Sequence, residues 1–260
     1  MLIKTIMKLH HIRNATFVIE SGEKHILVDP MLGPKGSGMP FTLFRFPAKK
    51  NPLIDLPSNA DDILQQVTHC LVTHLHPDHI DDAAVAFLKE RNIPVVCSTL
   101  DSKTLEKKGL TMELVLDYWK PVKYLGGEIT GIPAIHGYGF VKKITGNVMG
   151  FHLELPNDKS IYISSDTVYT EHVDKALKEL QPDITVMASG MAQLDFGKLL
   201  LMDKEDQVKF VKHSPGMVYA NHLEALNHCP NRREDLRALL RANNLLDKVA
   251  IPEDGEMVVF

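Results

Sequence analysis

The chain has 260 residues, of which 44% are hydrophobic, and this suits one large globular domain or two modest ones. The formal net charge of −4 gives no overall attraction to nucleic acid or to an anionic membrane, which argues against a nuclease, although a local basic patch stays open. The three cysteines form no Cys-x-x-Cys pair, and there is no signal-type segment or apolar run of about 18 residues. We therefore expect a cytoplasmic protein with reduced thiols.

Short strands are expected first, over residues 3–10, 15–20 and 26–28, with a turn at 21–24 between the last two. This spacing is typical of antiparallel hairpins. His10 and His11 fall at the end of the first strand with no other ligand-type residue nearby, so both are expected at the surface.

Regular periodicity is lost after Pro30. Residues 31–40 are dense in glycine and proline, and three phenylalanines and Arg45 follow before the next prolines. A segment of this length without periodicity is usually functional, so residues 31–60 are predicted to form a lid or pocket wall in which Phe44 and Arg45 contact an anionic substrate. The alternative is that the phenylalanines only pin the loop to the body of the protein or to another subunit.

The next stretch, residues 70–79, carries four side chains that can bind metal ions. Residues 71–73 form an apolar, β-branched run that predicts a short buried strand, and continued alternation would place His74 and His76 on one side of it. Pro77 ends the strand, and Asp78 and His79 fall in the following turn. Packing alone rarely produces such a density of ligand types, so the segment indicates a metal site.

Beyond this motif the pattern alternates between helices and strands. Helices are predicted over 81–91 and 101–107 around a strand at 94–98, followed by hairpins within 122–133 and 146–165. The remaining expected elements are helices over 171–180, 203–211 and 232–243 and strands over 184–188, over 217–222, near 249 and near 257. Two halves in which sheet is followed by helices predict two layers of sheet inside and helices outside.

Three further ligand-type residues each come directly after an apolar strand-like run. They are His136, Asp166 and His222. The loops at strand ends are where α/β proteins expose reactive groups, so these three are candidates for the same site.

The His-x-His-x-Asp-His motif, followed in order by His136, Asp166 and His222, resembles the signature of the metallo-β-lactamase-fold hydrolases. The opening residues 14–32 are most similar to the UlaG-like branch, which includes an ascorbate-6-phosphate lactonase. Many UlaG-like relatives have Gly-His-Ala where this chain has Arg13-Asn14-Ala15, so a role for a histidine there does not carry over, although Asn14 could hydrogen-bond near the site. The resemblance spans nearly the whole chain and implies a mixed α/β (α+β) fold, a four-layer αββα sandwich made by a single domain over residues 1–260.

The resemblance also implies two divalent metal ions. One would be bound by His74, His76 and His136, the other by Asp78, His79 and His222, and Asp166 would bridge them. Imidazoles and carboxylates suit zinc, with manganese or iron as alternatives because no thiolate ligand narrows the choice. Aspartate at the bridging position, where two-zinc lactamases of this fold commonly have cysteine, argues against antibiotic hydrolysis.

Two such ions would supply hydroxide near neutral pH, which Asp78 would orient before carrying a proton to the leaving group. We expect a hydrolase of a small ester-like molecule, such as a lactone or a phosphorylated or cyclic ester. A phosphodiesterase or nuclease, an iron-dependent oxidoreductase and a binding module without catalysis stay as alternatives. His228 is either a proton donor or substrate contact at the pocket mouth or a surface histidine. Cys229 beside it is expected to be structural, with a further ligand as the alternative. No nucleic-acid or membrane partner is expected, and a homo-oligomer stays open.

Overall fold

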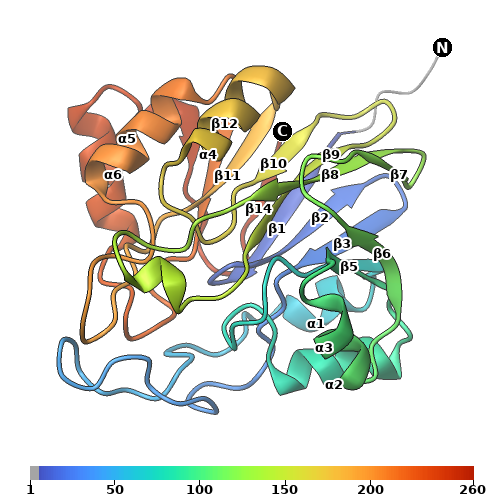
Figure 1. Cartoon of the computed structure of the whole chain (residues 1–260), viewed down its shortest axis with the longest axis horizontal. Helices are drawn as coiled ribbons and strands as arrows, with labels where there is room; N and C mark the ends of the chain where they lie inside the picture. Colours follow the sequence, from blue (N-terminus) through green and yellow to red (C-terminus); the bar gives the residue numbers. More distant parts are fainter. Residues whose placement is uncertain (1–5) are drawn as a thin grey trace.

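Two sheets of seven strands each form the centre of the structure, a computed structural model that describes residues 6–260 (Figure 1). In spatial order, the first sheet contains β14 (Met257–Val259), β1 (Lys8–Arg13), β2 (Thr16–Ser21), β3 (Lys24–Val28), β4 (His69–Leu71), β5 (Val95–Ser98) and β6 (Met112–Leu116). The second contains β13 (Val249–Ala250), β12 (Met217–Asn221), β11 (Ile184–Ala188), β10 (Ile161–Ile163), β9 (Met149–Glu154), β8 (Gly127–Pro133) and β7 (Val122–Tyr124).

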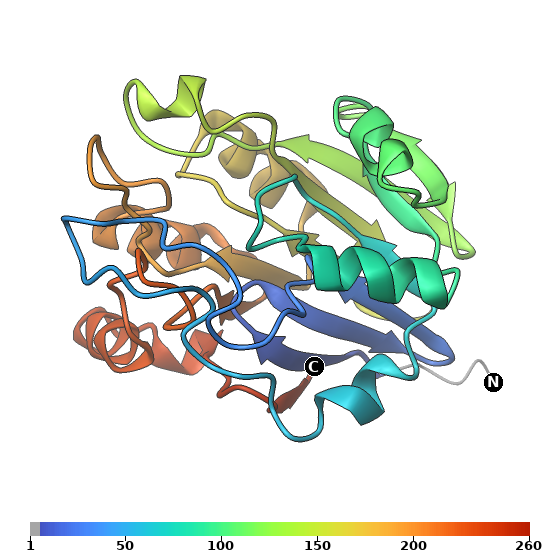
Figure 2. The same cartoon turned by 90° about the horizontal axis from the view of Figure 1, so that it is seen from below.

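Helices cover the outer face of each sheet (Figures 1 and 2). The first sheet is covered by α1 (Ala60–Leu64), α2 (Asp82–Glu90) and α3 (Ser102–Lys107), and the second by α4 (Glu171–Lys175) with a π-helical turn (Ala176–Leu180), α5 (Lys204–His213) and α6 (Arg233–Ala242). Two short 3-10 turns occur at Val141–Lys143 and Leu246–Lys248. The four layers confirm the αββα sandwich that was predicted from the sequence.

The alternation of side chains along the strands explains why the core has layers. In β3, Ile26 and Val28 pack between the two sheets, whereas Leu27 points the other way and packs beneath the helices. Both faces of the inner strands are therefore buried, which accounts for their nearly continuous apolar runs.

Parallel pairing brings the important strand ends to one edge. Strands β3, β4, β5 and β6 are parallel neighbours, as are β10, β11, β12 and β13, and β8 runs in the direction of β10 because both are antiparallel to β9. Each sheet therefore delivers the loops after its parallel strands to the same edge, where α/β folds place their sites.

Residues 31–59 contain no helix or ladder strand, only one isolated bridge between Gly38 and Asn51. This loop lies at the same end of the molecule as the segment around the 3-10 turn at Val141–Lys143 (Figure 2). Within residues 6–260, no helix is both long and apolar enough to cross a bilayer.

Most predicted elements are confirmed, with differences at their ends. The predicted strand over 3–10 is observed as β1, which extends to Arg13, and residues 3–5 lie outside the described residues. Helix α1 and strand β6 were not predicted, and the second half of the helix expected over 171–180 is a π-helical turn.

The surface position predicted for His11 is wrong. Its side chain is 1% exposed, and Nδ1 lies 2.9 Å from the hydroxyl of Tyr219. The C-terminal segment covers it, since backbone hydrogen bonds join His11 to Gly255 and Glu256, and a contact of such sequence separation leaves no local signal.

Candidate metal centre

Seven histidine and aspartate side chains converge at the edge that carries the ends of the parallel strands. Four of them lie in the loop that follows β4, one lies after β8, one after β10 and one directly after β12. They fall into two groups, within each of which the ligand atoms lie within 4.8 Å of one another: His74, His76 and His136, and then Asp78, His79, Asp166 and His222. Six of the seven are buried and His76 is half-buried.

Asp166 connects the two groups through one oxygen. Its Oδ2 lies 3.5 Å from Nε2 of His136 in the first group, and 3.3 Å and 3.4 Å from Nε2 of His79 and His222 in the second. Oδ2 of Asp78 lies 3.3 Å from Nε2 of His222 and 3.7 Å from Nε2 of His79. A carboxylate in this place can contact cations in both groups at once.

Several atoms that point into the cluster have no hydrogen-bond partner among the described residues. They are Nε2 of His74, His79 and His222 and Oδ1 of Asp166, all buried. Leaving a buried polar atom unpaired costs about 1–3 kcal/mol, so a folded protein retains several of them together only where another group satisfies them. Imidazole nitrogens and carboxylate oxygens are ligands of divalent transition metals, and the residues present therefore fit such ions.

The opposite nitrogen of three imidazoles is fixed by an oxygen. Nδ1 of His79 lies 2.8 Å from Oδ2 of Asp29, Nδ1 of His74 lies 3.0 Å from Oγ1 of Thr73, and Nδ1 of His136 lies 3.0 Å from the backbone oxygen of Leu200. In a neutral imidazole, such contacts place the proton on Nδ1 and leave the lone pair of Nε2 to bind a metal.

Asp29 is the centre of this supporting layer. Its two oxygens accept hydrogen bonds from the backbone N–H of Thr73 at 2.8 Å and the hydroxyl of Thr73 at 2.7 Å, in addition to the contact with His79. Ser165 in turn donates to Oγ1 of Thr73 at 2.8 Å. No role is predicted for Asp29 from the sequence, although it follows an apolar strand directly, as His222 does.

Asn14 links two loops that carry ligands. Its side-chain amide donates to the backbone oxygen of Asp78 at 3.0 Å, and its own backbone oxygen accepts from the N–H of His222 at 2.8 Å. Both Asn14 and His222 have positive φ angles, 55° and 59°, which hold the loops in a turn that most residues disfavour.

Charge is distributed unevenly between the two groups. Burial lowers the pKa of His74 well below its ordinary value and that of His136 to about 4, so both imidazoles are neutral at pH 7. Burial acts in the same direction on His79 and His222, but the carboxylates beside them, Asp166 foremost, outweigh it and raise both pKa values, that of His79 to about 10. Burial also opposes ionisation of Asp166, yet the facing imidazoles hold its pKa well below the ordinary range. The second group thus holds protons at pH 7, and a metal ion that binds there must displace them.

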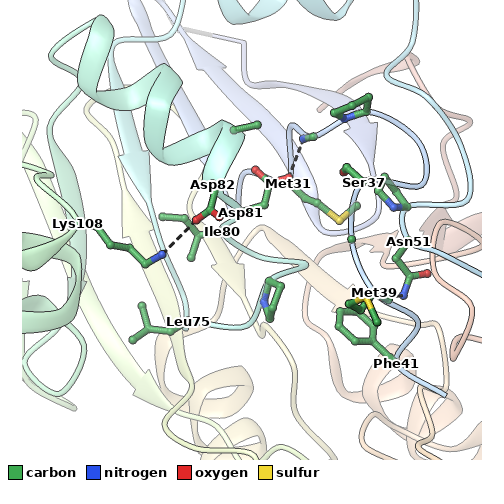
Figure 3. A pocket seen from close by; sticks show the side chains of 16 residues that line it. Met31, Ser37, Met39, Phe41, Asn51, Leu75, Ile80, Asp81, Asp82 and Lys108 are labelled. Atoms are coloured by element: carbon green, nitrogen blue, oxygen red, sulfur yellow. Dashed lines mark hydrogen bonds and ion pairs between the residues drawn. The ribbon is translucent and has the colours of Figure 1, made fainter. Parts of the chain in front are cut away.

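A cavity of about 460 Å³ borders the ligand-bearing loop (Figure 3). It lies between the 31–59 loop and the beginning of α2, and its apolar lining includes Met31, Met39, Phe41, Leu75 and Ile80. Leu75 and Pro77, which flank His76, also line it. Among the described residues that line it, Lys108 is the only cation, and its Nζ lies 3.4 Å from Oδ1 of Asp82.

None of the three residues predicted to contact substrate, Phe44, Arg45 and His228, is among the residues that line this cavity. Phe44 is 81% exposed, and the guanidinium of Arg45 donates to the backbone oxygens of Leu194 and Asp195 at 2.8 Å and 3.2 Å. His228 is 5% exposed and therefore lies below the surface, with its ring 4.8 Å from that of Phe41.

Comparison with known proteins gives consistent results. Residues 24–231 match the family model described as the beta-lactamase superfamily domain. The chain is 33% identical over 257 residues to the UPF0173 protein YddR of Bacillus subtilis strain 168, covering 98% of this chain and 100% of that protein. Among solved structures, the isothiocyanate hydrolase from Delia radicum gut bacteria is 30% identical with a TM-score of 0.88, covering 98% of this chain and 99% of that one. The structure described as a possible metal-dependent hydrolase from Veillonella parvula DSM 2008 is 29% identical with a TM-score of 0.88, covering 97% and 99%.

Proposed function

Because this chain belongs to the beta-lactamase superfamily, and within it to the UPF0173 metal-dependent hydrolases, we propose that it hydrolyses a small, mainly apolar molecule at a centre of two metal ions. The position of Asp166 carries the proposal, since its Oδ2 lies 3.3 to 3.5 Å from imidazoles of both ligand groups. When bound, two such ions supply Lewis acidity, which acidifies water and polarises the atom under attack. Zinc suits the imidazole and carboxylate donors, and manganese or iron are the alternatives.

The first ion would be held by His74, His76 and His136, and the second by Asp78, His79 and His222, with Asp166 shared. Asp78 has a second role in this proposal. Burial opposes its ionisation, but the imidazoles of His79 and His222 hold the pKa of Asp78 far below its ordinary value, so it is a carboxylate that can orient a water molecule. It would accept a proton from that water and pass it to the leaving atom.

The cavity favours an uncharged substrate over an anionic one. Its lining is mainly apolar, and its one cation, Lys108, lies beside the carboxylate of Asp82. An anionic phosphorylated ester would find no unpaired cation among the described lining residues.

An isothiocyanate is the first candidate substrate, because the solved isothiocyanate hydrolase matches this chain over nearly its full length. Hydrolysis of an isothiocyanate would bond the oxygen of water to the central carbon, with one proton passing to the nitrogen and one to the sulfur of the resulting thiocarbamic acid. Cleavage of its C–N bond, with transfer of the second proton to nitrogen, then gives one amine and one carbonyl sulfide from one isothiocyanate and one water.

A lactone is the second candidate. It is favoured by the resemblance of residues 14–32 to the lactonase branch and by aspartate at position 166. Ring opening needs the same attack on an electrophilic carbon, with Asp78 returning the proton to the leaving alkoxide.

The test combines metal analysis with substrate comparison. Protein purified without chelator is expected to contain two metal ions per chain, and His76→Ala and Asp166→Ala are expected to lose at least one. Wild type should consume benzyl isothiocyanate faster than γ-lactones or bis(p-nitrophenyl) phosphate, and Asp78→Asn should lower kcat by about 100-fold or more. Protein that folds and turns over without any metal would disprove the proposal, and faster turnover of the phosphodiester would replace it with phosphodiesterase chemistry.

A further inference from the structure

His222 differs from the other buried imidazoles of the metal centre in what fixes its outer nitrogen. His74, His79 and His136 each meet an oxygen at 2.8 to 3.0 Å, whereas Nδ1 of His222 lies 3.5 Å from the sulfur of Cys229. Sulfur is a weak acceptor with longer contacts than oxygen, and this separation is within the range of an N–H to sulfur hydrogen bond.

The side chain of Cys229 is closely packed between the loop of His222 and Gly190. Cys229 is 7% exposed, and its backbone N–H donates to the oxygen of Leu226 at 3.2 Å, which closes a turn beneath His222. A Cβ added at Gly190 would lie 3.0 Å from the sulfur and 2.2 Å from the backbone oxygen of His222. Only glycine at position 190 therefore permits the loop of His222 and the side chain of Cys229 to approach each other.

The other side of the sulfur meets a second imidazole. Nδ1 of His228 lies 3.8 Å from Sγ of Cys229, and the His228 ring packs edge-on against Phe41 of the cavity wall. Phe41 and His228 thus close the space around Cys229 and leave its sulfur facing imidazoles on both sides.

We infer that Cys229 is a positioning residue of the metal centre, whose sulfur accepts the Nδ1–H of His222 and holds Nε2 toward Asp78 and Asp166. The inference rests on the proposed metal centre. Fixing the proton on Nδ1 leaves the Nε2 lone pair free, and fixing the ring orientation aims that lone pair at the second ion. Loss of the sulfur should lower the affinity for the second ion. The affinity for the first ion should not change, because His222 is not one of its ligands.

The experiment is a titration of metal-free protein with cobalt(II), followed by visible absorption and elemental analysis. Cys229→Ala removes the acceptor, Cys229→Ser supplies a hydroxyl oxygen in its place, and Cys97→Ala is the matched control. Cys97 is also a fully buried thiol, but it contacts Met112 beneath the helices of the first sheet. The control therefore reports the effect of losing a buried thiol away from the centre.

We expect Cys229→Ala to bind the first cobalt ion as wild type does and the second about 10- to 100-fold more weakly, with a changed absorption band. Cys229→Ser should recover most of the loss, and Cys97→Ala should lower thermal stability without changing either affinity. Should Cys229→Ala fail to fold, Cys229→Val removes the acceptor while filling the space. Two ions bound by the alanine or valine variant with wild-type affinity and spectrum would overturn the inference alone, whereas wild type that binds no cobalt would overturn the metal centre itself.

Discussion

At the scale of single residues, the two ligand groups should respond differently to a metal ion because they hold different numbers of protons. His74 and His136 are neutral at pH 7, since burial lowers their pKa values, and they have no proton to lose. His79, with a pKa raised to about 10, and His222, with a pKa also raised, carry protons that a metal must displace from the nitrogen it binds.

Metal binding at pH 7 is therefore expected to release protons from the second group and none from His74 or His136. Calorimetric titration in buffers of different ionisation enthalpy measures the number released. His79→Ala should reduce that number, and His136→Ala should leave it unchanged. Equal proton release from both variants would contradict the assignment.

Asp29 should control metal affinity without touching the metal. Asp29→Asn replaces one of the two acceptor oxygens by an NH2 group, which cannot accept a hydrogen bond from Thr73 or His79. We expect about a 10- to 100-fold loss in affinity for the ion bound by His79. Asp101→Asn is the matched control, because Asp101 is also buried and accepts hydrogen bonds from Ser98 and Asn147, which are not ligands. The control should lose thermal stability and keep wild-type metal affinity in a chelator competition assay.

Four of the seven ligand-type residues could be predicted from the sequence because they form one dense motif over residues 74–79, which lies in the loop after β4. The other three, His136, Asp166 and His222, could be predicted because each follows an apolar run that marks a strand. The same rule applied to residues 26–28 would have indicated Asp29. The backbone oxygen of Leu200 could not be predicted, since any residue provides a carbonyl and only the fold brings it to His136. The contact of Cys229 with His222 could not be predicted from the sequence either, because it depends on the conformation of the turn between them.

At the scale of elements, the side chains of Asn227 and Asp195 both hold the 31–59 loop to the body. Asp195 accepts from the backbone N–H groups of Leu43, Phe44 and Arg45. Asn227 accepts from the N–H of Phe41 at 2.9 Å and donates to the backbone oxygens of Thr42 and Pro47 at 2.9 Å and 3.1 Å. It also exchanges hydrogen bonds with Asn51, one of 3.1 Å through its side chain and one of 2.9 Å from its backbone N–H. The loop itself has no ladder of hydrogen bonds that would replace these contacts.

Asn227→Ala should therefore loosen the loop, although Asp195 still holds residues 42–45, and should leave both sheets intact. We expect faster proteolytic cleavage within residues 39–50 and a higher KM, because Met39 and Phe41 would no longer form a fixed cavity wall. Metal content should not change. Asn243→Ala is the control, since Asn243 bonds only to the backbone of Leu239 within its own helical end, and it should behave as wild type. Unchanged cleavage and KM in Asn227→Ala would show that Asn227 does not hold this wall.

The order of helices and strands could be predicted better than their limits or their partners. Strand β11 was predicted with its observed ends, since a buried strand is marked by an uninterrupted apolar run. Strand β6 was not predicted because it lies at the sheet edge, where half-buried and exposed residues alternate and there is no such run. The role of Asn227 could not be predicted either, since its partners lie about 180 residues away.

At the scale of the whole molecule, both groups of ligand-type residues contain side chains from both sheets. His74 and His76 come from the first sheet and join His136 from the second, while Asp78 and His79 from the first join His222 from the second. The two halves are already packed through the core between the sheets, so the fold does not depend on metal for its layers. A bound ion nevertheless adds a link between them that the unfolded chain cannot form.

Metal should consequently raise the thermal stability of the entire chain. At a free metal concentration of 100 times Kd, one site adds about 2.7 kcal/mol to the free energy of unfolding, which for a chain of this size corresponds to about 5–10 °C in Tm. Asp166→Ala should lose most of this increment, because Asp166 lies beside both ligand groups. Asp101→Asn should start from a lower Tm and gain the same increment as wild type. Scanning calorimetry in the presence of zinc and in the presence of chelator measures the Tm increment of each protein. A wild-type Tm that is equal under the two conditions would contradict a metal link between the sheets.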